Sequence, residues 1–242
     1  MVPMEKREKR IADGTKALWL SPTGVQNLER CPRCFWLQYR KGIRQPEGIV
    51  SRLANRFDSV IKKYFDAYRP NLPPLVEKLL EGTLEDPFQE KYFYRHSDGY
   101  GYLGKLDECL VLSDTRRSPV DHKTSSSDPR EKETLSAYQD QLNAYAWLLE
   151  ENGKKTSGVG HLIYFYPDHA DDLEKRFPMV VHISTLKTNP DAAKRKFLHA
   201  LDVLESAMPH SAPDCPFCSW RAKMEDLTIA PHSKEKNQES LF

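Results

Sequence analysis

The sequence predicts an α/β (α+β) domain in which a mixed central sheet is flanked by helices. Two observations predict it: apolar residues recur at helical spacing in several long segments, and short strand-like runs lie between those segments. The expected order is helices, three strands, a helix, two strands and a helix, which suits a sheet with helices on its faces. The chain has 242 residues, the size of one domain with at most a small appendage.

The helical segments are marked by their ends and by their apolar spacing. Ser21-Pro22 predicts the start of the first helix, because serine caps a helix N-terminus and proline fits its first turn. Between Val50 and Arg69 apolar residues recur every three or four positions, which predicts an amphipathic helix. Two more helices are expected at 132–151, ending near Asn152-Gly153, and at 189–208.

Five strand-like runs lie among the helices. The runs 91–96 and 101–112 are joined by Ser97-Asp98-Gly99 and predict a hairpin with Asp-Gly at its turn. The run 118–123 is expected as a third strand with Pro119 near its start. Two further strands are expected at 158–167 and 177–184.

The two ends of the chain are polar. Residues 1–18 are expected as a flexible arm and 221–242 as a disordered tail, with the domain at 19–220 between them. No apolar run approaches the roughly 18 residues of a membrane helix, and MVPMEKREKR lacks the apolar stretch of a signal peptide. We therefore expect a cytoplasmic protein with no membrane partner.

Basic charge is concentrated early in the chain. The formal net charge is only +1, but the segment 30–56 holds seven basic residues against one acidic residue and also carries aromatic rings. Interleaved cations and rings suit a phosphate backbone with bases stacked beside it, and a solvated helix face is the alternative. The candidate nucleic-acid-binding residues are Arg30, Arg33, Arg40, Lys41 and Arg44.

The main catalytic candidates lie on two neighbouring predicted strands. Asp107 lies on one, and Asp121 and Lys123 lie on the next, where residues two apart point to the same face and His122 points away. Two adjacent carboxylates repel unless a cation lies between them, and oxygen ligands suit Mg²⁺ or Mn²⁺. A lysine beside such an ion can orient or deprotonate water, so the pattern favours phosphodiester hydrolysis.

Two helical positions could complete this site. Gln141 falls in the apolar stripe of the helix after Lys123, where its amide needs a partner such as an active-site group, and Tyr145 follows one turn later. Asp58 borders the apolar stripe of the earlier amphipathic helix. It could supply a third carboxylate, or form an i,i+4 salt bridge with Lys62.

The cysteines form two CxxC pairs. Four thiolates at this spacing can close around one zinc ion or around an iron–sulfur cluster, and a disulfide is disfavoured in a reducing compartment. Such a site would clip the early helical segment to the end of the domain, while Cys109 is expected in the core. The four candidate ligands are Cys31, Cys34, Cys215 and Cys218.

Taken in order, GKLDECLV (104–111), SPVDHKTSS (118–126) and QLNAY (141–145) resemble motifs of the PD-(D/E)XK nuclease superfamily, in particular its RecB-like branch. The segment 21–43 is similar to the N-terminal region of CRISPR-associated RecB-like nucleases with a four-cysteine cluster. The resemblance covers about 21–220 and implies a restriction-endonuclease-like core.

The resemblance also implies roles for single residues. Metal ligation would come from Asp107, Asp121 and the backbone carbonyl of His122, with Lys123 as the catalytic lysine. Gln141 and Tyr145 would contact substrate or orient the site, and Asp58 stands about where many relatives place a histidine or glutamate ligand. The similar nucleases place one cysteine early and three late around an iron–sulfur cluster, whereas the split here is two and two. The resemblance thus favours the cluster and the spacing alone favours zinc.

Two short motifs concern partners. GYGYLGK (99–105) matches the spacing of a phosphate-binding loop, but Leu106 replaces the required Ser or Thr and the run alternates like a strand, so no nucleotide cofactor is expected. QESLF at the C-terminus resembles the peptide that docks on the bacterial β sliding clamp, through Gln238, Leu241 and Phe242.

These observations predict a Mg²⁺- or Mn²⁺-dependent DNA nuclease, acting as an exonuclease or an endonuclease in DNA repair, recombination or CRISPR-type processing. An inactive nucleic-acid-binding module of the same fold, stabilised by zinc or an iron–sulfur cluster, is the alternative. A zinc-stabilised adaptor that recruits partners through its tail is a third possibility.

Overall fold

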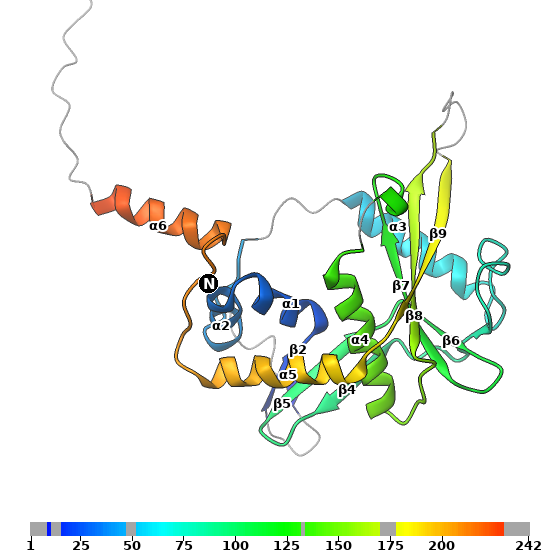
Figure 1. The fold of residues 1–242 in the computed structure, drawn as a ribbon, viewed down its shortest axis with the longest axis horizontal. Coiled ribbons are helices and arrows are strands. Elements are labelled where there is room, and N and C mark those ends of the chain that lie inside the picture. The colour runs from blue at the N-terminus through cyan, green and yellow to red at the C-terminus, as the bar shows by residue number, and fades with distance from the viewer. Residues whose placement is uncertain (1–8, 11–15, 47–51, 132–133, 170–177, 230–242) are drawn as a thin grey trace, which may run out of the picture.

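The computed structural model describes residues 9–10, 16–46, 52–131, 134–169 and 178–229 (Figure 1). The strands form two sheets. In spatial order, the first sheet contains β1 (Lys9–Arg10), β2 (Lys16–Leu20), β5 (Tyr100–Lys105) and β4 (Lys91–Arg95). The second contains β3 (Thr83–Leu84), β6 (Glu108–Val111), β7 (Arg117–Thr124), β8 (Val159–Pro167) and β9 (Met179–Lys187).

Six α-helices accompany the sheets in the described part of the chain. They are α1 (Pro22–Arg30), α2 (Pro32–Arg40), α3 (Arg52–Asp66), α4 (Ser136–Glu151), α5 (Pro190–Glu205) and α6 (Pro216–Ile229), with a short 3₁₀ turn at Pro129–Glu131. None of the helices in the described ranges combines the length and the apolar character that a bilayer span requires.

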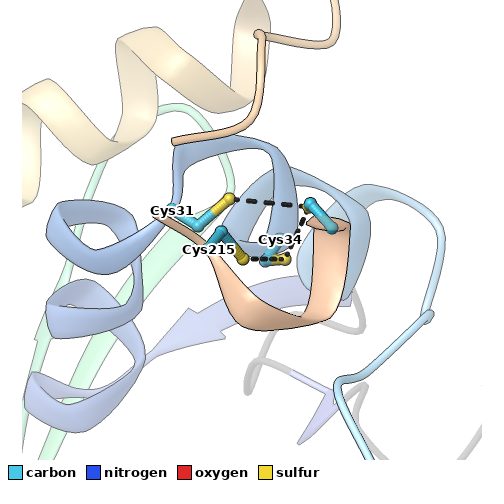
Figure 2. Close-up of side chains that lie close together, drawn as sticks. Cys31, Cys34 and Cys215 are labelled. Carbon is cyan, nitrogen blue, oxygen red and sulfur yellow. Dashed lines mark hydrogen bonds between the residues drawn. The ribbon is translucent and has the colours of Figure 1, made fainter. Parts of the chain in front are cut away.

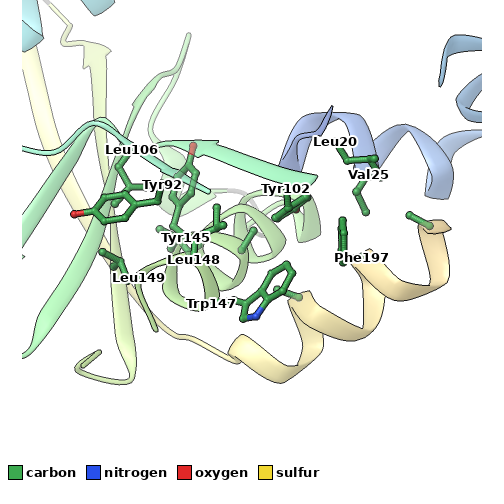
Figure 3. Packing of buried hydrophobic residues seen from close by; sticks show 14 of the residues in the cluster. Leu20, Val25, Tyr92, Tyr102, Leu106, Tyr145, Trp147, Leu148, Leu149 and Phe197 are labelled. Atoms are coloured by element: carbon green, nitrogen blue, oxygen red, sulfur yellow. The ribbon is translucent and has the colours of Figure 1, made fainter. Parts of the chain in front are cut away.

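Helix α4 is the centre of the main core. It contacts β4 and β5 of the first sheet, β7 and β8 of the second, and α5. Every residue from Leu142 to Leu149 is buried, so the helix is covered on all sides. Figure 3 shows Trp147 and Leu148 packed with Tyr102 of β5 and Phe197 of α5. Strand β5 passes so close to α4 that a Cβ at Gly104 would lie 2.5 Å from Leu148 Cδ1, so any larger residue there would force the Leu148 side chain to move.

Helix α3 covers the opposite face of the second sheet. Its residues Ile61 and Phe65 are buried in a second core with Val120 of β7 and Phe165 of β8. Strand β7 therefore lies between two cores, one on each face of the sheet. Because side chains alternate along a strand, successive side chains of β7 point to opposite faces of the sheet.

The sheet topology confirms the predicted mixed α/β fold. Strands β7 and β8 pair in parallel, with α4 as the crossover between them, whereas β6–β7 and β8–β9 are antiparallel. The predicted hairpin is β4–β5, which turns at Gly99 with a positive φ of 77°. Residues 100–105 of the phosphate-loop-like run form strand β5.

Four expectations about element boundaries differ from the structure. Strand β1 lies within the arm expected at 1–18, and strand β2 begins there at Lys16. The single strand expected at 101–112 is divided at Leu106-Asp107 into β5 and β6, which belong to different sheets. The first helical segment is two helices, because the chain is extended at Cys31 before Pro32 starts α2. Helix α6 continues to Ile229, past the point after Trp220 where we expected the polar tail to begin.

Candidate active site and cysteine metal site

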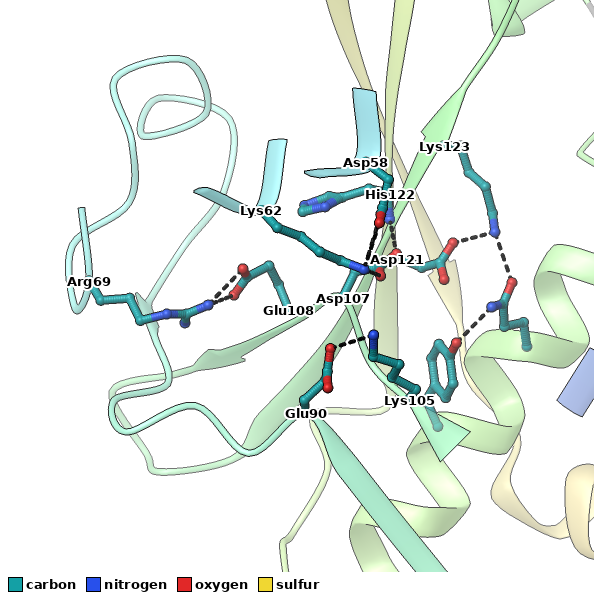
Figure 4. Close-up of polar contacts among 12 residues, drawn as sticks. Asp58, Lys62, Arg69, Glu90, Lys105, Asp107, Glu108, Asp121, His122 and Lys123 are labelled. Carbon is teal, nitrogen blue, oxygen red and sulfur yellow. Dashed lines mark hydrogen bonds and ion pairs between the residues drawn. The ribbon is translucent and has the colours of Figure 1, made fainter. Parts of the chain in front are cut away.

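Asp121 and Lys123 project from β7 toward α4, as strand alternation predicts. Asp121 is buried, and the Lys123 ammonium forms an ion pair with its Oδ2 atom (Figure 4). Lys123 Nζ also donates a hydrogen bond to Gln141 Oε1 at 2.8 Å. Gln141 Nε2 in turn donates to the hydroxyl oxygen of Tyr145 at 2.6 Å. The structure thus joins the predicted catalytic lysine to both residues of the predicted helix motif.

Asp107 lies between β5 and β6, where the chain passes from one sheet to the other. Its Oδ2 atom accepts a hydrogen bond from the backbone N–H of His122 at 3.0 Å, which places the carboxylate beside β7. Its Oδ1 atom lies 2.9 Å from Lys62 Nζ. Lys62 also pairs with both oxygens of Asp58, at 3.0 and 3.1 Å, so the i,i+4 salt bridge expected as one alternative for Asp58 is formed.

The electrostatics of the site follow from this burial. Burial raises the pKa of Asp121 to about 6, and the charge of Asp107 adds to this effect while Lys123 opposes it. Burial also raises the pKa of the Tyr145 hydroxyl well above its usual value, so this group stays protonated. Burial alone would lower the pKa of Lys62, but the ion pairs with Asp107 and Asp58 outweigh it and raise that pKa.

The side chain of His122 points to the opposite face of the sheet. Its ring centroid lies 4.7 Å from that of Phe65 and 5.8 Å from that of Phe165. Neither ring nitrogen has a hydrogen-bond partner among the described residues, and burial lowers the pKa of the ring to about 4. Only the backbone of His122 therefore faces the carboxylates.

The donor set fits a hard divalent cation. Asp107, Asp121 and the carbonyl of His122 offer oxygen only, the ligand type that Mg²⁺ and Mn²⁺ prefer. Asp58, Asp107 and Asp121 do not bring their carboxylate oxygens within 4.8 Å of one another. In the described part of the chain, only the four cysteines form a group of three or more possible ligands that lie this close together. The lysines Lys62 and Lys123 hold the carboxylates instead.

Two residues of the site were missed by sequence reasoning. Lys62 was expected only as a surface partner of Asp58, because its contact with Asp107 joins residues far apart in the sequence. Tyr138, at the start of α4, places its ring centroid 4.4 Å from Lys123 Nζ. Its position in the apolar stripe of the helix gave no signal of this contact.

The four cysteines converge as predicted (Figure 2). Each pair begins a helix in the same way: Cys31 and Cys215 precede a proline, and their carbonyls accept from the N–H groups of Phe35 and Ser219 at 3.1 and 3.0 Å. The sulfur of Cys34 lies 3.7 Å from that of Cys215 and 3.5 Å from that of Cys218. The Cys31 and Cys218 sulfurs are 3.9 Å apart, and none of the four cysteines forms a disulfide.

Helix N-termini favour thiolates. The sulfurs lie at the starts of α2 and α6, where the helix dipole favours negative charge. Burial raises the pKa values of Cys34 and Cys218, whereas at Cys31 burial is outweighed by hydrogen bonds, which lower the pKa to about 7. Cys109 is separate from this cluster and fully buried in the core, as expected. The cysteine site thus joins the two ends of the described domain.

The basic candidates lie on or near α1 and α2 and differ in their contacts. Arg40 pairs with Glu205 of α5 at 3.8 Å, and Lys41 Nζ lies 5.7 Å from the Trp36 ring centroid. Arg30 is exposed at the end of α1. Arg33 and Arg44 line a cavity of about 320 Å³ between α2 and α6.

This cavity, which we call the arginine groove, lies on one side of the cysteine cluster. Arg221 joins Arg33 and Arg44 in its lining, together with Phe217 and Trp220. The Trp220 side chain is 65 % exposed. Gln238, Leu241 and Phe242 of the expected clamp-binding peptide lie outside the described residues.

The candidate site thus combines the acidic residues Asp107 and Asp121 with Lys123 of β7, and Gln141 of the crossover helix contacts that lysine. The sequence model of the PD-(D/E)XK nuclease superfamily matches residues 103–222, a span that includes Asp107, Asp121, Lys123 and Gln141. Through this segment the chain belongs to the PD-(D/E)XK nuclease superfamily.

Solved structures resemble the chain at low identity. The protein in the structure titled "Crystal structure of SSO0001" is 17 % identical, with a TM-score of 0.45, over 90 % of this chain and 87 % of that one. An alkaline exonuclease (LHK-Exo) from Laribacter hongkongensis is 10 % identical, with a TM-score of 0.43, over 86 % of this chain and 91 % of that one. No curated protein matches the chain.

Proposed function

We propose that this protein is a Mg²⁺- or Mn²⁺-dependent deoxyribonuclease that hydrolyses phosphodiester bonds of DNA. The observation that carries the proposal is the chain of contacts from Asp121 through Lys123 and Gln141 to Tyr145, beside Asp107. Lys123 is fixed beside the buried carboxylate of Asp121, and such partly buried charged pairs are costly to desolvate and are common at functional sites. DNA repair, recombination or CRISPR-type processing is the proposed setting, by resemblance to RecB-like nucleases.

Asp107, Asp121 and the backbone carbonyl of His122 would hold the divalent ion, and Asp58 adds a third negative charge to the cluster. When bound, the ion supplies Lewis-acid activation of the phosphate and of water. Lys123 orients the attacking water and opposes the negative charge that develops on the phosphate in the transition state. Gln141 fixes the Lys123 ammonium, and the Tyr145 hydroxyl fixes the Gln141 amide.

For the cysteine site we propose a single tetrahedral zinc ion rather than an iron–sulfur cluster. Four thiolates about 2.3 Å from one zinc lie about 3.8 Å from one another at the corners of a tetrahedron. The three sulfur–sulfur distances of 3.5, 3.7 and 3.9 Å agree with this value. In a cluster each thiolate binds a separate iron atom, so the four sulfurs lie farther apart.

Cleavage assays test the enzymatic proposal. Purified protein is incubated with labelled single-stranded DNA, duplex DNA and RNA in the presence of Mn²⁺, beside Lys123→Ala and the control Lys105→Ala. Lys105 is also near the site, but it pairs with Glu90 on the surface at 2.7 Å (Figure 4). We expect cleavage of DNA by the wild type and Lys105→Ala only.

Two other outcomes would contradict this proposal. Equal cleavage by wild type and Lys123→Ala would reject the site assignment. Binding of DNA by the wild type without cleavage would favour the inactive binding module of the same fold.

Anaerobic purification tests the metal of the cysteine site. We expect a colourless protein with one zinc ion per chain by elemental analysis, and loss of that zinc in Cys218→Ser but not in Cys109→Ala. A brown protein containing iron and acid-labile sulfide would establish the cluster instead. Docking of the C-terminal QESLF on a sliding clamp stays a prediction.

A further inference from the structure

Lys62 joins two of the three acidic side chains of the candidate active site. Its ammonium lies 2.9 Å from Asp107 Oδ1 and 3.0 Å from Asp58 Oδ1. The Lys62 side chain is only 25 % exposed and that of Asp107 only 16 %, so this pair is largely shielded from solvent, whereas Asp58 is about half exposed. In a site that binds two divalent cations, one cation would lie between two carboxylates. The Lys62 ammonium takes such a position between Asp58 and Asp107.

We infer that Lys62 is a tethered cation that replaces a second divalent ion, so that the site binds one Mg²⁺ or Mn²⁺ per chain. Asp58 then acts by holding Lys62 and is not itself a metal ligand. This inference rests on the proposed function, because it takes Asp107 and Asp121 as the ligands of the single ion.

The fold holds Lys62 in this place. Its neighbour Ile61 and its i+3 neighbour Phe65 are buried against β7 and β8. These contacts fix which face of α3 packs on the sheet. Both oxygens of Asp58, one turn earlier on the same helix, contact the ammonium. Withdrawal of Lys62 would therefore leave Asp58 and Asp107 facing each other without a counter-charge.

The charges of the site agree with a single ion. Three carboxylates and the two ammonium groups of Lys62 and Lys123 leave one negative charge in excess. One divalent ion converts this to one positive charge, which a single phosphodiester of the substrate balances. A second divalent ion would leave a large uncompensated positive charge in a partly buried site.

The opposing possibility is that Lys62 moves away and Asp58 becomes a ligand of the ion. The two arrangements differ in the number of ions that a Lys62 variant binds. Without the ammonium, our arrangement leaves Asp58 and Asp107 free to bind a second ion. In the opposing arrangement, removal of Lys62 removes only a competitor, so one ion binds more tightly.

Titration of Mn²⁺ into the purified protein without DNA, with the cysteine site loaded, tests this by calorimetry and by electron paramagnetic resonance of free Mn²⁺. We expect one Mn²⁺ per chain for the wild type, for Lys62→Arg and for the exposed neighbour Lys63→Met. We expect two for Lys62→Met, and one again for Lys62→Met combined with Asp58→Asn. Circular dichroism verifies that each variant is folded. If Lys62→Met alone does not fold, the Mn²⁺ binding of Lys62→Arg is compared with that of Asp58→Asn/Lys62→Met.

Each remaining outcome overturns a specific claim. Two ions in the wild type, or a single and more tightly bound ion in Lys62→Met, would overturn the inference and leave the proposed nuclease intact. If Lys62→Met does not fold, weaker binding of a single ion by the double variant than by Lys62→Arg, together with loss of DNA cleavage, would assign Asp58 as a ligand. No Mn²⁺ binding by the folded wild type would overturn the proposed function itself.

Discussion

The Lys123 ammonium donates to Gln141 Oε1 at 2.8 Å, and this contact ties the candidate catalytic lysine on β7 to the crossover helix α4. The amide is itself held by Tyr145 at 2.6 Å. Lysine has a long flexible side chain, so a fixed acceptor is what keeps its charge at one place. We therefore expect Gln141 to act as a positioning residue rather than as a group that reacts.

Gln141→Ala tests this relationship. We expect a single-turnover DNA cleavage rate roughly 10- to 100-fold below that of the wild type, because the ammonium loses its fixed position. DNA affinity should stay unchanged, since Gln141 makes its contacts within the protein. Gln139→Ala is the control, because Gln139 bonds to Asn143 and the Lys187 carbonyl, away from Lys123. A normal rate in Gln141→Ala would remove the positioning role.

His122 gives a second prediction, because its side chain and its backbone face opposite sides of β7. Both ring nitrogens are buried without a hydrogen-bond partner in the described structure, which costs free energy that an apolar ring would not lose. We expect His122→Phe to keep DNA cleavage and to raise the free energy of unfolding by up to about 1–3 kcal/mol. Urea unfolding and the cleavage assay measure the two effects.

The opposite result for His122 would be informative. If His122→Phe stays folded but loses cleavage, the imidazole takes part in the reaction and the contribution of this residue is not confined to its backbone. His122→Leu repeats the test with a smaller side chain, which separates the loss of the nitrogens from overpacking.

Local patterns predicted the parts of the site that depend on local geometry. Alternation along β7 placed Asp121 and Lys123 on one face and His122 on the other, because residues in any strand alternate. Helical spacing placed Gln141 one turn before Tyr145 and Asp58 one turn before Lys62 for the same reason. The CxxC spacing likewise predicted the convergence of the four cysteines.

Contacts between distant segments could not be predicted in this way. The break at Leu106-Asp107 depends on tertiary structure, because Leu106 is fully buried and its N–H bonds to the Glu90 carbonyl while β6 pairs with β7. The contact between Lys62 and Asp107 depends on how α3 packs on the sheet. A strand pattern continues through such a break, so the sequence alone indicates one strand.

The cysteine site gives a stability prediction. It joins the starts of α2 and α6, which lie far apart in the sequence: Cys34 and Cys215 are separated by 181 residues. Removal of the ion by a strong chelator should lower the melting temperature of the wild type, since metal binding contributes directly to folding free energy. Cys34→Ser/Cys218→Ser should already melt at the lower temperature and should not respond to the chelator. An equal melting temperature with and without the ion would contradict a structural role.

A buried ion pair behind the active site gives a fourth prediction. Arg69 binds both oxygens of Glu108, at 2.7 and 2.6 Å, and Glu108 is only 1 % exposed. Arg69→Ala should reduce the free energy of unfolding by about 3–5 kcal/mol, because it leaves a buried carboxylate without its partner. Arg69→Met/Glu108→Met should lose less than Arg69→Ala, since neither charge then remains. Urea unfolding measures both.

The matched control for this pair is Arg116→Ala. Arg116 pairs with Asp114 at 2.6 Å, but both side chains are about half exposed. Exposed pairs typically contribute less than about 1 kcal/mol, so this variant should unfold close to the wild type. A similar loss in Arg116→Ala and Arg69→Ala would show that burial is not what makes the Arg69 pair important.

The arginine groove gives the last prediction, which concerns DNA affinity rather than chemistry. Arg33 and Arg44 line it beside the exposed ring of Trp220, so cations and an aromatic surface are available to one strand of nucleic acid. Arg33→Ala/Arg44→Ala should bind a single-stranded oligonucleotide more weakly, and the slope of log K against log salt should fall by up to about one for each arginine that contacts a phosphate. Arg130→Ala is the control, because Arg130 is exposed but paired with Asp128. An unchanged salt slope in the double variant would exclude the arginine groove from the DNA-binding surface, and the exposed Arg30 would then be the next arginine of the set to test.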